Sequence, residues 1–164
     1  MLPYHTPLSI AQLRALAIPG PWAFGQMDRT RFGEIDALNH VNNTAYLRWF
    51  ESLRLPYLRS RQVSDYGPRS PRLVLAEIGC RFLAEMGINQ DYVVTARTRA
   101  FRTSSFVTDY AVWAMDAAKP EAPAILTAEA HAVIVLRTQD GDNKFPIPDA
   151  ARRLFADLDG AEAF

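Results

Sequence analysis

Four long segments between residues 73 and 137 have the composition of β-strands. They span residues 73–84, 92–103, 106–115 and 125–137. Valine, isoleucine, threonine and aromatic residues, which favour strands, are frequent in them. A short turn at residues 103–105 follows the second segment, and a loop at residues 117–123 follows the third. Because short links join neighbouring strands that run in opposite directions, we expect an antiparallel sheet.

Two of these segments predict a sheet with one buried face. In segment 73–84, residues 75, 77, 79 and 81 alternate with a set that we expect to face the core, namely Val74, Ala76, Ile78, Cys80 and Phe82. That period of two is typical of a half-buried strand. In segment 125–137, one face carries the small residues Ala128, Ala130 and Ala132, followed by Ile134. Small side chains allow a helix to pack close to the middle of the sheet.

One long helix is predicted ahead of these strands. The polar stretch at residues 36–43 leads into apolar residues spaced three and four apart, namely Tyr46, Trp49, Phe50, Leu53 and Tyr57. This spacing indicates one apolar helical face. We expect the helix to begin near Asn42 or Asn43, and Pro56 to end or kink it near Leu55.

Shorter elements complete the predicted order. Residues 22–35 have a weak strand pattern, and short helices are expected at residues 9–17 and 148–158. We expect a single domain, because 164 residues suit one domain. We expect that domain to span residues 21–164, with residues 1–20 as an N-terminal extension. The order of strand, helix and four strands predicts an α+β fold with an antiparallel sheet of about five strands and short terminal helices.

Composition excludes several classes of function. Lys and Arg number 18, as do Asp and Glu, so no excess charge predicts nucleic-acid binding. No apolar run is long enough to predict a membrane span. The chain has a single cysteine, Cys80, and residues 1–20 show no secretory pattern, which together favour the cytoplasm. Cys80 and three scattered histidines show no metal-ligand spacing. Neither a serine-hydrolase elbow nor a nucleotide-binding motif is present, and no cofactor is expected.

The segment before the helix carries a family resemblance. Arg31-Phe32-Gly33-Glu34-Ile35-Asp36, Asn39-His40-Val41-Asn42-Asn43, Tyr46-Leu47 and Phe50-Glu51 with Arg54 resemble the signature of the 4-hydroxybenzoyl-CoA thioesterase-like acyl-CoA thioesterases. The His-Val-Asn-Asn run is also similar to that of plant acyl-ACP thioesterases. Many relatives have Gly where this chain has Asn39, which also tolerates a left-handed backbone. The resemblance implies a hotdog fold, in which the sheet wraps around the helix, over residues 21–164.

The resemblance also implies a reaction and roles for individual residues. It implies hydrolysis of an acyl-CoA to free acid and CoA, with Asp36 as general base or nucleophile. The Asn43 backbone N–H matches the amide that polarises the thioester carbonyl, and donors at a helix start suit that task. His40 has three candidate roles: to orient Asp36, to hold water or to contact the thioester. The expected substrate-binding residues are Asn39, Asn42 and Tyr46.

Alternatives exist for residues and for function. Asp36 and Asn42 taken singly are equally typical of turn and helix caps. Glu51 is a further catalytic candidate, or else it forms a surface ion pair with Arg48 or Arg54. The rival functions are a hotdog protein that binds an acyl group or partner without hydrolysis, an acyl-carrier-protein thioesterase, and, ranked lower, a dehydratase. By resemblance, a homodimer or homotetramer is expected, and acyl carrier protein is an alternative partner.

Overall fold

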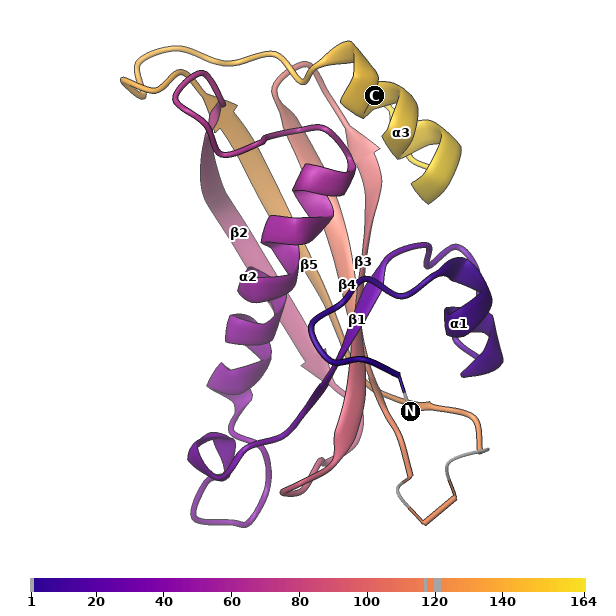
Figure 1. Cartoon of the computed structure of the whole chain (residues 1–164). Coiled ribbons are helices and arrows are strands. Elements are labelled where there is room, and N and C mark those ends of the chain that lie inside the picture. The colour runs from indigo at the N-terminus through magenta and orange to yellow at the C-terminus, as the bar shows by residue number, and fades with distance from the viewer. Residues whose placement is uncertain (1, 117, 120–121) are drawn as a thin grey trace.

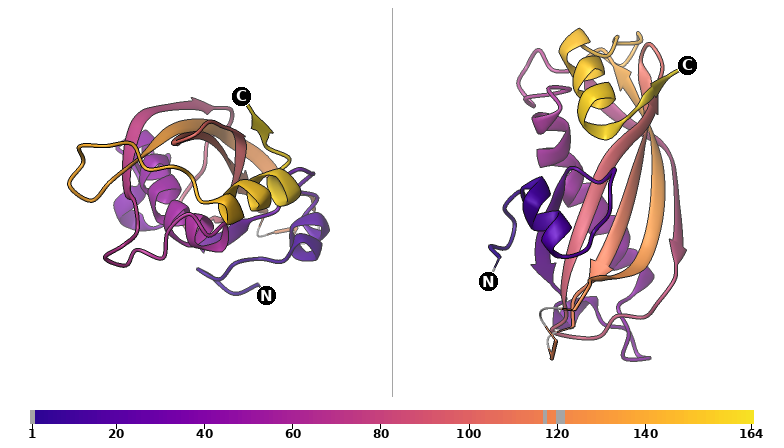
Figure 2. Two further views of the ribbon diagram at one scale, coloured as in Figure 1. Left: turned by 90° about the horizontal axis from the view of Figure 1, so that it is seen from above. Right: turned by 90° about the vertical axis from the view of Figure 1, so that its right-hand side faces the viewer.

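One curved antiparallel sheet encloses a long helix. The computed structural model describes residues 2–116, 118–119 and 122–164, so residues 117, 120 and 121 of the expected loop at 117–123 lie outside the described residues. The sheet has the order β1-β3-β4-β5-β2, formed by β1 (Gly25–Arg29), β2 (Arg72–Phe82), β3 (Asp91–Phe101), β4 (Ser105–Ala114) and β5 (Ile125–Arg137) (Figure 1). Seen from above, it curves around α2 (Asn43–Ser60) (Figure 2).

The main core lies between α2 and the inner face of the sheet. The predicted apolar face of α2 is buried, and the Phe50 ring stacks on Tyr110 of β4 with centroids 5.0 Å apart. The alanines of β5 are in the same core: Ala128 and Ala132 are fully buried, and Ala130 is 8% exposed. The predicted alanine face of β5 is therefore buried, in the same core as the apolar face of α2.

Two effects were predicted for Pro56: the prediction that it ends α2 near Leu55 is wrong, and a kink there stays a prediction. The helix runs through Pro56 to Ser60, with Arg61 as its C-cap. Proline cannot donate the hydrogen bond of its own turn, which costs stability in a helix interior. The next two residues, Tyr57 and Leu58, are fully buried in the main core, and that packing favours continuation of the helix.

The predicted buried face of β2 is correct at Ile78 and Cys80 only. Leu75 pairs with Ile134 of β5 and Glu77 pairs with Val133, so the residue between them is a β-bulge. A bulge adds one residue and reverses the alternation beyond it. Ile78 and Cys80 pack on the core as expected. The other three residues of the predicted face, Val74, Ala76 and Phe82, are exposed, as is Leu75.

The N-terminal extension packs against the outer face of the sheet. The helix α1 (Ile10–Ala15) begins after Ser9, whose hydroxyl accepts from the Gln12 N–H in a capping box. Leu13 and Ile18 are fully buried in a second apolar cluster with Trp113 of β4. The strand predicted at residues 22–35 is shorter than expected, because the chain leaves the sheet after Arg29 and forms the 3-10 helix η1 (Phe32–Glu34).

The C-terminal segment closes one end of the enclosed helix. The predicted helix is present as α3 (Asp149–Asp159), and Gly160 ends it in the left-handed conformation. Phe155 of α3 packs on Phe101 and Phe106 of the sheet. A two-residue strand, β6 (Glu162–Ala163), then pairs in parallel with β3. No such strand is expected from the sequence, because two residues carry no detectable period.

Candidate active site

A tight turn connects η1 to the start of α2 and holds the Asp36 side chain. The Asp36 N–H donates to the His40 carbonyl at 2.9 Å, and the Asn39 N–H donates to the Asp36 carbonyl at 3.1 Å. Asn39 has φ 63°, the left-handed conformation that asparagine tolerates. Asp36 Oδ1 accepts from the Leu38 N–H at 2.8 Å and from the His40 N–H at 3.3 Å. The turn therefore engages Oδ1 in two hydrogen bonds, and among the described residues no donor is paired with Oδ2.

The helix start supplies backbone donors beside this turn. Asn42 is the N-cap of α2, and its side-chain oxygen accepts from both the N–H and the hydroxyl of Thr44, at 2.9 and 2.8 Å. Asn43 is the first helical residue, so its N–H has no acceptor within the helix. The positive end of the helix dipole lies at the same place. An oxygen that gains negative charge is stabilised at such a position.

The turn and the helix start share one cavity. Its volume is about 380 Å³, and the residues that line it are Asp36, His40, Val41, Asn43, Tyr46, Phe82, Leu83, Ala84 and Glu85. Four of the seven residues proposed from the sequence are thus brought together. Asn39 and Asn42 form the turn and the cap just outside this lining. Glu51 lies on the exposed side of α2 and makes no ion pair with any described residue.

The His40 imidazole contacts a carboxylate other than Asp36. Its Nε2 lies 2.9 Å from Oε2 of Glu85, a residue that follows β2. A neutral His40 that donates Nε2–H to Glu85 presents Nδ1 as an acceptor. Glu85 was missed by the sequence reasoning, because it lies 45 positions from His40 and belongs to no recognisable motif. The only signal was a lone acid in the apolar stretch after β2.

Aromatic rings form the inner wall of the cavity. Tyr46 is 3% exposed, and its ring meets Phe82 at 5.1 Å and Trp49 at 4.8 Å between centroids. Burial raises the pKa of Tyr46 to about 12, with a further contribution from nearby Cys80. Tyr46 therefore stays protonated near neutral pH. The wall suits an apolar or aromatic acyl group next to the polar turn.

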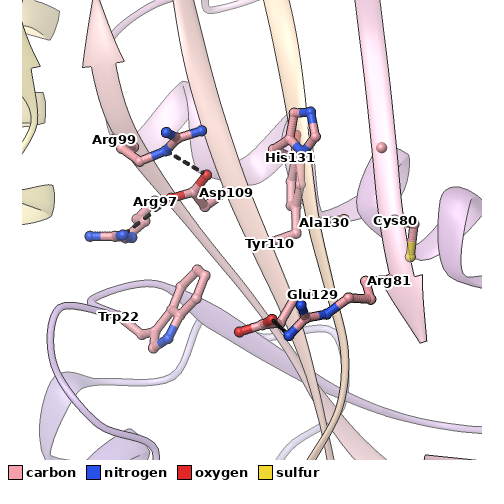
Figure 3. A pocket seen from close by; sticks show the side chains of 11 residues that line it. Trp22, Cys80, Arg81, Arg97, Arg99, Asp109, Tyr110, Glu129, Ala130 and His131 are labelled. Carbon is pink, nitrogen blue, oxygen red and sulfur yellow. Dashed lines mark hydrogen bonds and ion pairs between the residues drawn. The ribbon is translucent and has the colours of Figure 1, made fainter. Parts of the chain in front are cut away.

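A larger groove, of about 590 Å³, lies on the outer face of the sheet (Figure 3). Its side chains are paired with one another: Asp109 lies 3.1 Å from Arg97 and 3.0 Å from Arg99, and Arg81 lies 3.3 Å from Glu129. Pairing of acids with bases leaves no carboxylate there free for catalysis. The smaller cavity at the start of α2 is the better candidate active site.

Comparison with known proteins identifies the family. The model of the thioesterase-like superfamily matches residues 30–155, which is more than half of the chain. The chain belongs to the thioesterase-like superfamily. The matched range includes the turn, α2 and strand β2, whose Phe82 lines the candidate site. Membership in this superfamily supports thioester hydrolysis in general, without specifying the acyl group or its carrier.

Solved structures of thioesterases share the fold. A thioesterase superfamily protein from Jannaschia sp. CCS1 is 52% identical, with a TM-score of 0.94 and 100% of both chains covered. The 4-hydroxybenzoyl-CoA thioesterase from Pseudomonas sp. strain CBS-3 has a TM-score of 0.66 and 17% identity, over 79% of this chain and 96% of that one. These matches confirm the predicted hotdog fold. Comparison with curated proteins finds no match.

A third related structure contains ligands. A thioesterase from Thermus thermophilus, in complex with coenzyme A and Zn, has a TM-score of 0.66 and 24% identity, over 85% of this chain and 95% of that one. In the present thioesterase-like chain, no cluster of potential metal-binding side chains occurs among the described residues. Nor is any helix in the described ranges long and apolar enough to cross a membrane.

Proposed function

We propose that this chain hydrolyses acyl-CoA thioesters to a free acid and CoA. The observation that carries the proposal is that Asp36, His40, Asn43 and Tyr46 line one cavity at the start of α2. A carboxylate can activate water or attack the carbonyl, and a helix N-terminal N–H can stabilise the carbonyl oxygen as it becomes negative, so together they suit thioester hydrolysis. A CoA-bound thioesterase of the same fold supports CoA as the carrier.

Asp36 has two routes to products. As a general base, Oδ2 accepts a proton from water while the water oxygen attacks the thioester carbonyl. The C–S bond of the tetrahedral intermediate then breaks, and the thiolate takes up a proton. As a nucleophile, Oδ2 attacks the carbonyl directly, the thiolate leaves, and water hydrolyses the acyl-aspartyl anhydride. In both routes the Asn43 N–H donates to the carbonyl oxygen as it becomes negative.

The other site residues support this chemistry. We assign to Glu85 the orientation of His40, whose free ring nitrogen then faces the water or the thioester. Tyr46 contributes a protonated hydroxyl and a ring surface to the acyl wall. Asn39 and Asn42 maintain the turn and the cap. Glu51 lies outside the cavity, and we assign it no step within one copy of the chain.

We also propose that the chain works as a homodimer joined at β2, with a tetramer as a further assembly. Within the described residues, β2 pairs with β5 alone, so its other edge has unpaired backbone groups. Val74 and Leu75 on this strand are 38% and 44% exposed, which is a hazard for a free strand edge. Phe82 ends the same strand and lines the cavity, so a partner at this edge lies beside the site. Light scattering after size exclusion measures the assembly directly.

Thiol release from a panel of acyl thioesters tests the function. The panel contains short, medium, long and aromatic acyl-CoA substrates and one acyl group on a carrier protein. We expect release from at least one acyl-CoA. If thiol is released only from the carrier-protein substrate, the acyl carrier is a carrier protein and CoA is not. Binding of an acyl-CoA with no release from any member contradicts hydrolysis and favours the non-catalytic acyl-binding function.

A further inference from the structure

Glu34 connects the turn that holds Asp36 to two points on α2. It ends η1, two residues before Asp36, and its side chain is 16% exposed. Its carbonyl accepts from the Asn42 N–H at 2.7 Å, and its Oε1 accepts from the Trp49 indole N–H at 2.8 Å. Its Oε2 accepts from the Arg31 N–H at 2.8 Å. One residue is thus bonded to the N-cap and to the middle of the helix.

The Trp49 end of this connection is firmly held. Trp49 is 6% exposed, and its ring stacks on Tyr92 of β3 with centroids 4.1 Å apart and planes at 25°. A buried indole N–H without an acceptor costs free energy, so Trp49 and Glu34 stay together. Because Trp49 is fixed in the core, the bond fixes the position of Glu34 relative to the helix.

This connection spans the two groups that the proposed reaction brings to the thioester. Asp36 follows Glu34 by two residues on one side, and Asn43 follows the bonded Asn42 on the other. Catalysis by a carboxylate and an oxyanion donor depends on their spacing, and a misplacement of about 1 Å costs on the order of 100-fold in rate. A bond that sets this spacing acts on kcat without contact with the substrate.

We propose that Glu34 is a positioning residue, which through Trp49 and Asn42 sets the placement of the Asp36 carboxylate relative to the Asn43 N–H. This inference rests on the proposed thioester hydrolysis. Glu34 does not line the cavity, so the inference assigns it no contact with substrate. The competing explanation is that Glu34 and Trp49 form an ordinary buried hydrogen bond that contributes to stability alone.

The chain contains a matched control for that explanation. Trp113 is 7% exposed, and its indole N–H donates to Thr95 Oγ1 at 2.9 Å, on the outer face of the sheet. Trp49→Phe and Trp113→Phe each remove one buried indole hydrogen bond and the same volume. A role in stability alone predicts that neither variant changes kcat beyond its loss of folded protein.

Steady-state kinetics separate the two explanations. We expect Trp49→Phe and Glu34→Ala to lower kcat by about 10- to 100-fold with a smaller change in KM, and Trp113→Phe to lower kcat less than about 2-fold. Glu34→Gln retains an oxygen acceptor for Trp49, so we expect it to keep most of the parental kcat. Both variants are assayed at a temperature at which each is fully folded. Equal kcat values for Trp49→Phe and Trp113→Phe under that condition overturn the inference.

Absence of hydrolysis by the parent chain refutes the proposed function. Hydrogen exchange tests the inference about Glu34 independently of that outcome. Amide exchange is measured by mass spectrometry over residues 36–46 in the parent and both tryptophan variants. We expect faster exchange there in Trp49→Phe and parental exchange in Trp113→Phe. Parental exchange in Trp49→Phe means that the bond does not hold this segment, and the inference then fails.

Discussion

A buried ion pair joins the end of α3 to the end of α2, and its removal is expected to destabilise the whole domain. Asp159 is 0% exposed and Arg61 is 4% exposed at the side chain, with 2.6 Å between Oδ1 and the guanidinium. The same carboxylate accepts from the Tyr57 hydroxyl at 2.5 Å and from the Thr98 N–H at 3.3 Å. Helix α2, strand β3 and helix α3 therefore meet at one carboxylate.

The structure sets the expected magnitude of Asp159→Asn. The amide removes the negative charge and one acceptor oxygen, which leaves Arg61 buried without its counter-ion. Breaking a buried pair in this way costs about 3–5 kcal/mol. For a domain of this size, each kcal/mol lowers the melting temperature by about 2–4 °C, so the expected loss is roughly 6–20 °C.

Urea unfolding and calorimetry measure this loss, with Asp157→Asn as the control. Asp157 lies two residues earlier on the same helix and is exposed. Substitution of an exposed, unpacked residue is expected to change the free energy of unfolding by about 0.5 kcal/mol or less. A loss below about 1 kcal/mol for Asp159→Asn refutes the argument that the buried Arg61 depends on this carboxylate.

Two further predictions concern the thiol and the turn. Burial raises the pKa of Cys80 to about 11, so at pH 8 the folded chain holds roughly 100-fold less thiolate than a chain unfolded in urea. Alkylation by iodoacetamide, followed by mass spectrometry, is expected to be correspondingly slower in the folded chain, and equal rates contradict the burial argument. At Asn39, with φ 63°, a β-branched residue is strained, so Asn39→Val is expected to cost about 1–2 kcal/mol, whereas Asn39→Gly costs less. Urea unfolding compares the two, and equal stability is the contrary result.

The general architecture was predictable because it depends on periodicity. The spacing of Tyr46, Trp49 and Phe50 predicts a helix with one apolar face, and the alanines of β5 predict the close packing of that helix. The sequence contains no comparable signal for register. The bulge between Leu75 and Glu77 adds one residue to β2, and an uninterrupted apolar pattern does not reveal where such a residue lies.

The site was predictable in its local part only. Asp36, His40, Asn43 and Tyr46 lie within eleven positions of one another, and a short turn followed by a helix places them together. Glu85 comes from a distant part of the chain and depends on the tertiary fold for its contact with His40. Outside the site, the same holds for Asp159 and its partner Arg61. The sequence does not show which Asp or Glu side chains are buried, and most of them are exposed to solvent in folded proteins.

Thiol release by Asp36→Asn, compared with the parent chain and with Asp140→Asn, tests the central claim most directly. Asp140 is a matched control, because its Oδ1 caps a turn by accepting from the Asp142 N–H at 3.0 Å, as Asp36 accepts from Leu38. Asp140 follows the C-terminal end of β5, while Phe82 of the cavity pairs with Ala128 near the other end. We predict a loss of at least about 100-fold for folded Asp36→Asn and parental release for Asp140→Asn. Parental release by a folded Asp36→Asn variant contradicts the account.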